Sequence, residues 1–320
     1  MLRYVTFAIK VQLNVHDLNN EAVAGNVTDI RIMDFLNENG DRVEAPAVSG
    51  RMLKHWHYEA LRQHINQGSY NSLPLCAGCK VGEPLRPGEM SNSKLIQVTK
   101  VKEADALRSC AICDIHGYLI AKGAEGEAGV SARRISRALF SWLMPVLNSE
   151  FASKQVIHTR VSQQEERAKG EAAAQMIFNK SYASGIYAFV SALDIERIGL
   201  IELNLGSEQP YAIKDPERKE RAKVAIEAYR HLISGQIGAS LSHAIPHTKP
   251  IEILVAYSEN GVLPFPVSPV YQKYIEDTVG LMPEHAKLLY WGEKSPEGVE
   301  KRSSIDEIFQ ELIKKMEEAK

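Results

Sequence analysis

The chain has 320 residues, of which 44% are hydrophobic and 24% are charged, a composition typical of a folded globular protein. These values exclude disorder, collagen and a coiled coil as descriptions of the whole chain. With 38 basic and 40 acidic residues the formal net charge is −2, so contact with nucleic acid requires locally clustered cations. Neither a bilayer-spanning apolar run nor a signal-peptide core is found, which predicts a cytoplasmic protein without membrane contact.

The N-terminal segment gives the clearest pattern. Apolar side chains alternate with polar ones from Val5 to Val15, which predicts a long strand with one buried face. A polar loop is expected over residues 18–26, followed by a weaker strand-like stretch that ends at Pro46. Ser49 is placed to cap a helix that runs to about Asn66, with Gly68 just beyond its end.

The rest of the chain contains further predicted elements, separated by two long excursions. A Pro-, Gly- and Ser-rich insertion is expected over residues 69–107, and a polar excursion over residues 162–184. The predicted helices are residues 131–147, 215–235 and 303–320, and the predicted strands are residues 154–161, 185–195 and 251–258.

The most clearly predicted elements follow the order strand, helix, strand, strand, helix, strand. This order predicts an α+β fold with a ferredoxin-like, RRM-like core and large helical and hairpin insertions. The expected division is a discontinuous core, here called the palm, with a finger-type insertion, a thumb-like excursion and a C-terminal helical segment. The corresponding residues are 1–68, 148–161 and 185–292 for the palm, 69–147 for the finger, 162–184 for the thumb and 293–320 for the C-terminal segment.

The four cysteines form two C-x-x-C pairs, Cys76 with Cys79 and Cys110 with Cys113. Four thiolates at such spacing favour a structural zinc site, because a closed sulfur shell leaves no position for a catalytic water. The 30 residues between the pairs exceed the usual spacing of roughly 15 to 20. Disulfides or unrelated thiols are the alternatives, and disulfides are rare in cytoplasmic proteins.

Cations cluster in two places. Residues 131–160 carry five cations and one acid, and the predicted helix after Ser49 has a basic front that includes Arg51, Lys54 and His55. Arginine forks bind phosphates and stack on bases, and the helix start offers free N–H groups to an anion. An ordinary solvated helix face is the alternative for both clusters.

Signals for an enzyme are weak by comparison. The sequence has no P-loop, no GxSxG elbow and no HExxH motif. Asp29 and Asp34 follow the first strand and its loop, where two acids could hold a metal ion in a ribonuclease. Exposed loop acids are the simpler interpretation, and the chain is expected not to be an enzyme.

Several weak motifs in one order resemble the DevR-type CRISPR-associated proteins, which form the backbone subunit of type I-A or I-B Cascade complexes. The motifs are LNNEAVAGNVTDIR (18–31), PAVSGRMLKHW (46–56), GVSARRISR (129–137) followed by Met144 and Pro145, IHTRVS (157–162) and QMIFNKSYASGIYAF (175–189). The resemblance implies a non-catalytic subunit that polymerises along a guide RNA (crRNA) in antiviral defence. The paired C-x-x-C elements are not a general feature of the family.

The resemblance also implies which residues contact RNA. They lie in the loop after the first strand, at the start of the first helix, in the motif of residues 129–137, on the palm strand and on the thumb that displaces a guide nucleotide. The expected RNA-binding residues are Asn19, Asn26, Arg31, Ser49, Arg51, Lys54, His55, Arg133, Arg134, Ser136, His158, Arg160, Gln175, Met176 and Phe178.

The implied partners are the guide RNA, the target DNA strand paired with it, further copies of the chain and other Cascade subunits. These subunits are the backbone-capping, large and small subunits, with a helicase-nuclease recruited to the complex. Two alternatives stay open, a metal-dependent ribonuclease of the type III backbone kind that uses Asp29 or Asp34, and an autoregulatory nucleic-acid-binding protein.

Overall fold

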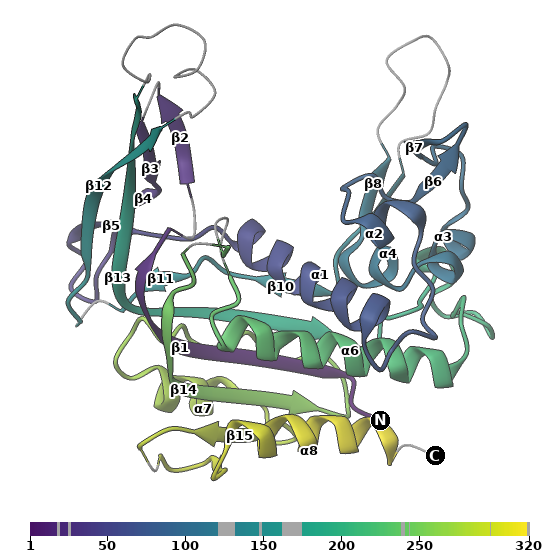
Figure 1. Cartoon of the computed structure of the whole chain (residues 1–320). Coiled ribbons are helices and arrows are strands. Elements are labelled where there is room, and N and C mark those ends of the chain that lie inside the picture. The colour runs from purple at the N-terminus through teal and green to yellow at the C-terminus, as the bar shows by residue number, and fades with distance from the viewer. Residues whose placement is uncertain are drawn as a thin grey trace, which may run out of the picture.

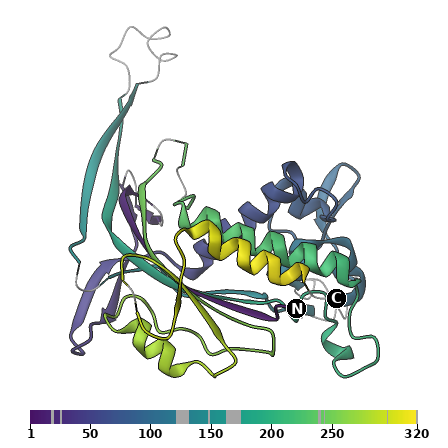
Figure 2. The ribbon, with the colours of Figure 1, turned by 90° about the horizontal axis from the view of Figure 1, so that it is seen from below.

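A computed structural model gives the arrangement of the chain (Figures 1 and 2). It describes residues 1–17, 20–24, 27–120, 132–146, 149–161, 175–237, 241–242, 244–294 and 296–318, with the backbone alone for residues 20–24, 27–28, 159–161 and 175–178. Within these residues no helix is long and apolar enough to span a membrane.

A large mixed sheet forms the centre of the molecule. Its path runs β16, β15, β14, β1, β13, β3, β2, and β10, β11 and β12 also pair with β13. The pairs of β13 with β1, β10, β11 and β12 are antiparallel, as is the pair of β1 with β14. Its described strands are β1 (Tyr4–His16), β2 (Asn20–Ala24), β3 (Val27–Ile30), β10 (Ala138–Phe140), β11 (Met144–Pro145), β12 (Ala152–Val161), β13 (Gln175–Asp194), β14 (His247–Ser258), β15 (Lys287–Trp291) and β16 (Glu300–Lys301).

Helices cover both faces of this sheet. Phe7 on β1 stacks on Tyr229 of α6, with ring centroids 4.1 Å apart, and lies near Phe309 of α8. Ala8, the next residue, points the other way and packs with Tyr274 of α7. Figure 2 shows α6 and α8 side by side and α7 away from them. These helices are α1 (Gly50–Gln67), α6 (Asp215–Ile233), α7 (Tyr274–Leu281) and α8 (Ile305–Glu317).

The expectation of one buried face for the first strand was therefore wrong. Residues of both faces of β1 are buried in its first half, because α7 covers the face that the sequence suggested was solvated. Val15, expected on the buried face, is 55% exposed and has a φ of 55°. It lies at an irregularity between Leu13 and His16, where the register against β13 shifts.

The helix expected over residues 131–147 is also absent from the described part, residues 132–146. Three short strands, β9 (Ala132–Arg134), β10 and β11, take its place. Ala138 pairs with Leu193 and Met144 with Ala188, so this segment completes the edge of β13. Pairing with a distant strand outweighs local helix propensity here.

Two expected loops also contain strands. The polar loop of residues 18–26 includes β2, which pairs with β3. The excursion of residues 162–184 is shorter than expected, because β13 already begins at Gln175 and pairs with β12 over residues 152–161. Together β12 and the first half of β13 form a long arm that projects beyond the sheet (Figures 1 and 2).

The insertion after α1 consists of short elements on the opposite side of α1 from this arm (Figure 1). Ala60 and Leu61 of α1 share one buried core with Ile112 and Ile115, so the insertion packs on α1. Its elements, with the remaining hairpin and 3₁₀ helix, are α2 (Ala77–Val81), β6 (Gly88–Ser91), β7 (Lys94–Gln97), α3 (Glu103–Ser109), α4 (Ala111–His116), β8 (Tyr118–Ile120), β4 (Ile32–Leu36), β5 (Arg42–Pro46) and η1 (Glu202–Asn204).

Candidate nucleic-acid interface

The start of α1 lies beside an open hollow of about 620 Å³. Five residues predicted to bind RNA line it, although they come from three separate segments of the chain. These residues are Arg31, Ser49, Arg51, Lys54 and Ser136, and the rest of the lining is Gly50, Ala138, Leu139, Phe140 and Trp142. The start of α1, beside which the hollow lies, stands between the arm and the insertion (Figure 1).

Local chemistry fixes the start of α1. The Oγ of Ser49 accepts a hydrogen bond of 3.3 Å from the N–H of Met52, as expected for an N-cap residue. Gly50 permits close packing, since a Cβ there would lie 2.7 Å from the carbonyl oxygen of Phe140. The segment that contains β10 therefore packs directly against the helix start and brings Ser136 to the hollow.

The lining is basic and partly aromatic. None of the ten residues around this hollow is acidic. Arg51 is exposed, and the guanidinium of Arg31 lies over the ring of Trp142, 5.6 Å from its centroid. Burial, with a smaller contribution from Arg86, lowers the pKa of Lys54 to about 8. Such a surface favours an anion with flat apolar groups, which describes a polynucleotide strand.

Other predicted residues lie outside the hollow. His55 is exposed on α1, with its ring 5.2 Å from that of Trp56, and Arg133 is exposed on β9. His158 lies on the arm, where its Nε2 is 3.2 Å from the hydroxyl of Tyr182.

Only the backbone is described for the remaining arm residues, which places Met176 opposite Arg160 and Phe178 opposite His158. Gln175 pairs with Val161 at the beginning of the described part of β13. Asn19 and Asn26 lie outside the described residues.

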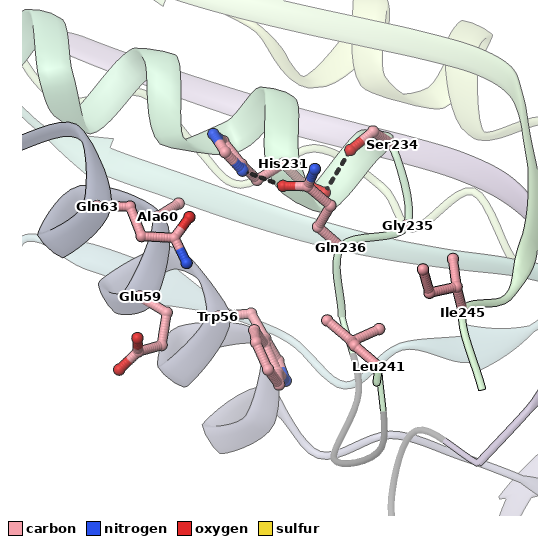
Figure 3. Close-up of a pocket in the computed structure, with 10 residues that line it drawn as sticks. All are labelled: Trp56, Glu59, Ala60, Gln63, His231, Ser234, Gly235, Gln236, Leu241 and Ile245. Atoms are coloured by element: carbon pink, nitrogen blue, oxygen red, sulfur yellow. Dashed lines mark hydrogen bonds between the residues drawn. The ribbon is translucent and has the colours of Figure 1, made fainter. Parts of the chain in front are cut away.

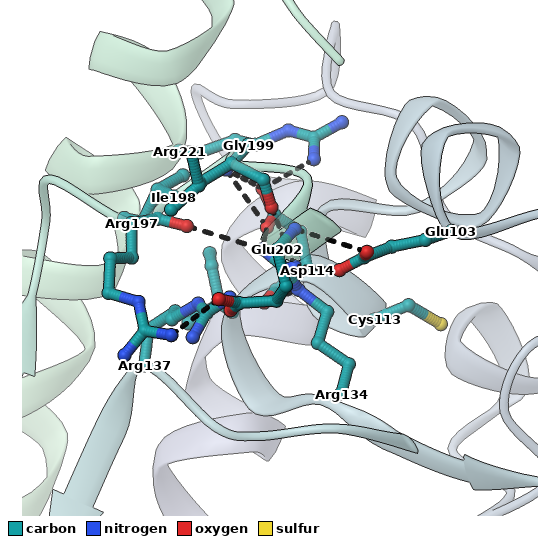
Figure 4. Close-up of polar contacts among 12 residues, drawn as sticks. Glu103, Cys113, Asp114, Arg134, Arg137, Arg197, Ile198, Gly199, Glu202 and Arg221 are labelled. Atoms are coloured by element: carbon teal, nitrogen blue, oxygen red, sulfur yellow. Dashed lines mark hydrogen bonds and ion pairs between the residues drawn. The ribbon is translucent and has the colours of Figure 1, made fainter. Parts of the chain in front are cut away.

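Arg134 is a correction to the predicted surface. Its side chain is fully buried, and its guanidinium pairs with Asp114 at 2.5 Å and with Glu103 at 2.7 Å (Figure 4). Arg137 is also buried and pairs with Glu202. Two arginines of the basic cluster of residues 131–160 therefore lie inside the protein, where acids distant in sequence neutralise their charges. We remove Arg134 from the RNA-facing set.

The four cysteines converge, as their spacing predicted. All are buried, and their sulfur atoms lie within 4.8 Å of one another. The sulfurs of Cys76 and Cys113 are 3.8 Å apart, and the four thiols form no disulfide. Four ligands at about 2.3 Å from a tetrahedral zinc ion would be separated by about 3.8 Å. The donor set and its geometry therefore fit a metal ion with four sulfur ligands.

Asp29 and Asp34 do not join a comparable site. Asp29 accepts a hydrogen bond of 2.7 Å from Ser181, and Asp34 pairs with Arg42 at 2.9 Å. In the described part of the chain the four cysteines are the one group of three or more potential metal ligands. In this part of the chain Asp29 and Asp34 are not gathered with other potential ligands into a metal site of the kind that a metal-dependent ribonuclease would use.

A second hollow, of about 430 Å³, lies between α1 and the end of α6 (Figure 3). Trp56, Leu241 and Ile245 give it an apolar side. Its acid, Glu59, pairs with Arg62 at 2.6 Å. Because its lining contains no lysine or arginine, it is a poorer candidate for a phosphate than the hollow at the start of α1.

The sequence missed Arg86, Trp142 and Asp114. Arg86 lies in an insertion without a helical or strand period, and Trp142 lies in a segment that was predicted to be a helix, so neither was marked as part of this surface. Asp114 follows Cys113 directly, but its partners Arg134 and Arg221 are distant in sequence. No local signal could have found that cluster.

The fold and the hollow define an α+β protein with a candidate nucleic-acid interface. A family model described as CRISPR-associated negative auto-regulator DevR/Csa2 matches residues 7–279. The chain therefore belongs to the DevR/Csa2 family.

Similar proteins agree with this assignment. The chain is 29% identical to a CRISPR-associated protein Cas7/Cst2/DevR of Methanocaldococcus jannaschii, over 96% of this chain and 98% of the relative. It is 27% identical to a protein of the same description from Thermoproteus tenax, over 98% and 95%. A solved chain of a CRISPR RNA-guided surveillance complex shares the fold, with a TM-score of 0.54, 12% identity and coverage of 98% and 99%.

Proposed function

We propose that the chain is a non-catalytic backbone subunit that binds the crRNA of a type I Cascade complex and oligomerises along it. The observation that carries the proposal is the convergence of Arg31, Arg51 and Lys54, with Ser49 and Ser136, in one hollow without acids. Family membership and the surveillance-complex fold support the same conclusion.

The sheet supports an RRM-like palm. The strands β14, β1 and β13, followed by the β10–β12 edge, have the neighbour order of a ferredoxin-like sheet, and all these pairs are antiparallel. The helices α1 and α6 connect the strands on one face. In this proposal the palm comprises residues 1–68, 148–161 and 185–292, the finger residues 69–147, the thumb residues 162–184 and the C-terminal segment residues 293–320.

The basic hollow suits an RNA whose sequence varies. Contacts with phosphates position a strand without reading its bases, which leaves the bases free to pair with target DNA. The thumb side chains Met176 and Phe178 are proposed to interrupt base stacking at intervals. Head-to-tail contacts between copies would generate an open helical filament, on which the backbone-capping, large and small subunits and the recruited helicase-nuclease assemble.

The four-cysteine site is proposed to hold zinc. Zinc would supply a cross-link between α2 and α4 and stabilise an insertion with few apolar residues of its own. The residues that would hold it are Cys76, Cys79, Cys110 and Cys113.

Charge reversal tests the RNA-binding function. Lys54→Glu and Arg160→Glu should each weaken crRNA binding by about tenfold and reduce the slope of log affinity against log salt by about one. Lys287→Glu is the control, because Lys287 is exposed on β15, across the sheet from the hollow. If both test variants keep the wild-type affinity and salt slope, Lys54 and Arg160 do not contact the RNA.

A further inference from the structure

The finger insertion places a second cation beside Lys54. The guanidinium of Arg86, in the loop between α2 and β6, lies over the ring of Tyr58 on α1, with 5.1 Å between Cζ and the ring centroid. Tyr58 is one helical turn after Lys54. The loop therefore carries Arg86 onto the basic side of α1 and covers the part of that side at Tyr58, which is buried.

The two cations influence each other. The positive charge of Arg86 contributes to the lowered pKa of Lys54, after the larger effect of burial. Both charges also contribute to the lowered pKa of His116, whose ring is buried beneath this region, again after burial itself. Two cations that oppose each other's charge in this way favour an anion between them.

No acid in the described structure neutralises this pair. Neither Lys54 nor Arg86 takes part in any of the ion pairs of the described residues. The Nη1 atom of Arg86 is buried and has no hydrogen-bond acceptor in the same part of the chain. A buried guanidinium nitrogen without an acceptor costs free energy, and an anion beside the half-buried side chain of Arg86 would offset part of that cost through its charge.

The loop that carries Arg86 is built on the first cysteine pair. The N–H of Gly88 lies 3.4 Å from the sulfur of Cys76, and the N–H of Glu83 donates to the carbonyl of Gly78. Packing is close, since a Cβ on Gly88 would lie 2.6 Å from the carbonyl oxygen of Leu85. The carbonyl of Arg86 also accepts a hydrogen bond from Gln97 of β7. These contacts fix the position of the Arg86 backbone, and therefore the point from which its side chain extends toward Tyr58.

We infer that Arg86 and Lys54 together bind one phosphate of a polynucleotide backbone, and that the fold around Cys76 holds Arg86 in place for it. This inference rests on the proposed function and extends the basic surface from the hollow toward the finger. A guanidinium and an ammonium can share the oxygens of one phosphate, each through a charge-assisted hydrogen bond.

Substitutions that keep the size of the side chains test the pair. Arg86→Gln should weaken binding of a labelled oligouridylate by about tenfold. This is the lower end of the range expected for losing one hydrogen bond to a charged group. Lys54→Gln should act similarly, and the double variant should lose less than the product of the two, because both contact one phosphate. Arg62→Gln is the matched control on α1, since Arg62 already pairs with Glu59.

The outcomes separate the inference from the proposed function. If Lys54→Gln weakens binding but Arg86→Gln matches the wild type, the inference fails and the function stands. Independent, fully multiplicative losses would show two separate contacts and also overturn the shared phosphate. If the wild-type protein does not bind the RNA at all, the proposed function itself fails.

A third variant tests the role of the loop. Gly88→Ala keeps all four cysteines and both cations, but its new Cβ would displace the backbone around Leu85. Its RNA affinity should fall toward that of Arg86→Gln while its thiols still bind added zinc. Wild-type affinity in Gly88→Ala, or in wild-type protein stripped of metal, would show that Arg86 does not depend on the cysteine fold.

Discussion

The guanidinium of Arg221 donates a hydrogen bond of 2.8 Å to the carboxylate of Asp114, although the two residues are 107 positions apart. Asp114 lies in α4 of the insertion after α1 and Arg221 lies in α6, and both side chains are fully buried. The same carboxylate pairs with Arg134, and its two oxygens share the hydrogen bond donated by the N–H of Gly199 (Figure 4). One carboxylate therefore joins this insertion to α6.

Removing the charge of Asp114 should destabilise the protein strongly. Asp114→Asn would leave Arg134 and Arg221 without their shared buried anion, and breaking such a pair costs about 3–5 kcal/mol. Urea unfolding should show this loss in the free energy of unfolding. Asp105→Asn is the matched control, because Asp105 and Arg108 form an exposed pair that contributes at most about 1 kcal/mol. Similar losses in both variants would contradict a special role for Asp114.

Local signals predicted the start of α1 and the cysteine cluster well. Ser49 caps the helix and Gly68 follows its end, both as the sequence indicated. The C-x-x-C spacing places each cysteine pair across the first turn of a short helix, which is a local geometry. Four of the five predicted RNA-binding residues that line the hollow come from the motifs of residues 18–31 and 46–56.

Contacts between residues far apart in the sequence explain where the sequence-based predictions were wrong. The segment of residues 131–147 has helical spacing, but β9 in it pairs with β8, and β10 and β11 pair with β13. Arg133 and Arg134 carry the same charge, but Arg133 is exposed whereas Arg134 is buried and pairs with Asp114 and Glu103. A single sequence gives the charge of a residue but not the distant partner that neutralises it.

RNA binding should depend on pH through Lys54. Its pKa is lowered to about 8 in the free protein, and a bound phosphate favours the charged amine. Affinity is therefore highest below pH 7 and falls as the pH rises through 8, by about tenfold between pH 7 and 9. Fluorescence anisotropy at constant ionic strength measures this. Lys54→Arg should lose most of the pH dependence, since arginine stays charged; an equal fall in that variant would assign the titration to another group.

Elemental analysis tests the metal site. The purified chain should contain about one zinc ion, because the site offers four sulfur ligands. Cys113→Ser should lower the zinc content and the melting temperature, since metal binding would stabilise an insertion made of short elements. Ser109→Ala is a nearby control that leaves the sulfurs unchanged. Metal-free protein with the full melting temperature would contradict the zinc proposal.

The mass of the protein–RNA particle as a function of RNA length tests the central claim most directly. Native mass spectrometry of the chain with crRNAs of increasing length should show mass rising in steps of one 35.6 kDa subunit, because each copy holds a fixed stretch of backbone. A particle whose protein mass stays constant as the RNA lengthens would contradict a subunit that polymerises along its guide.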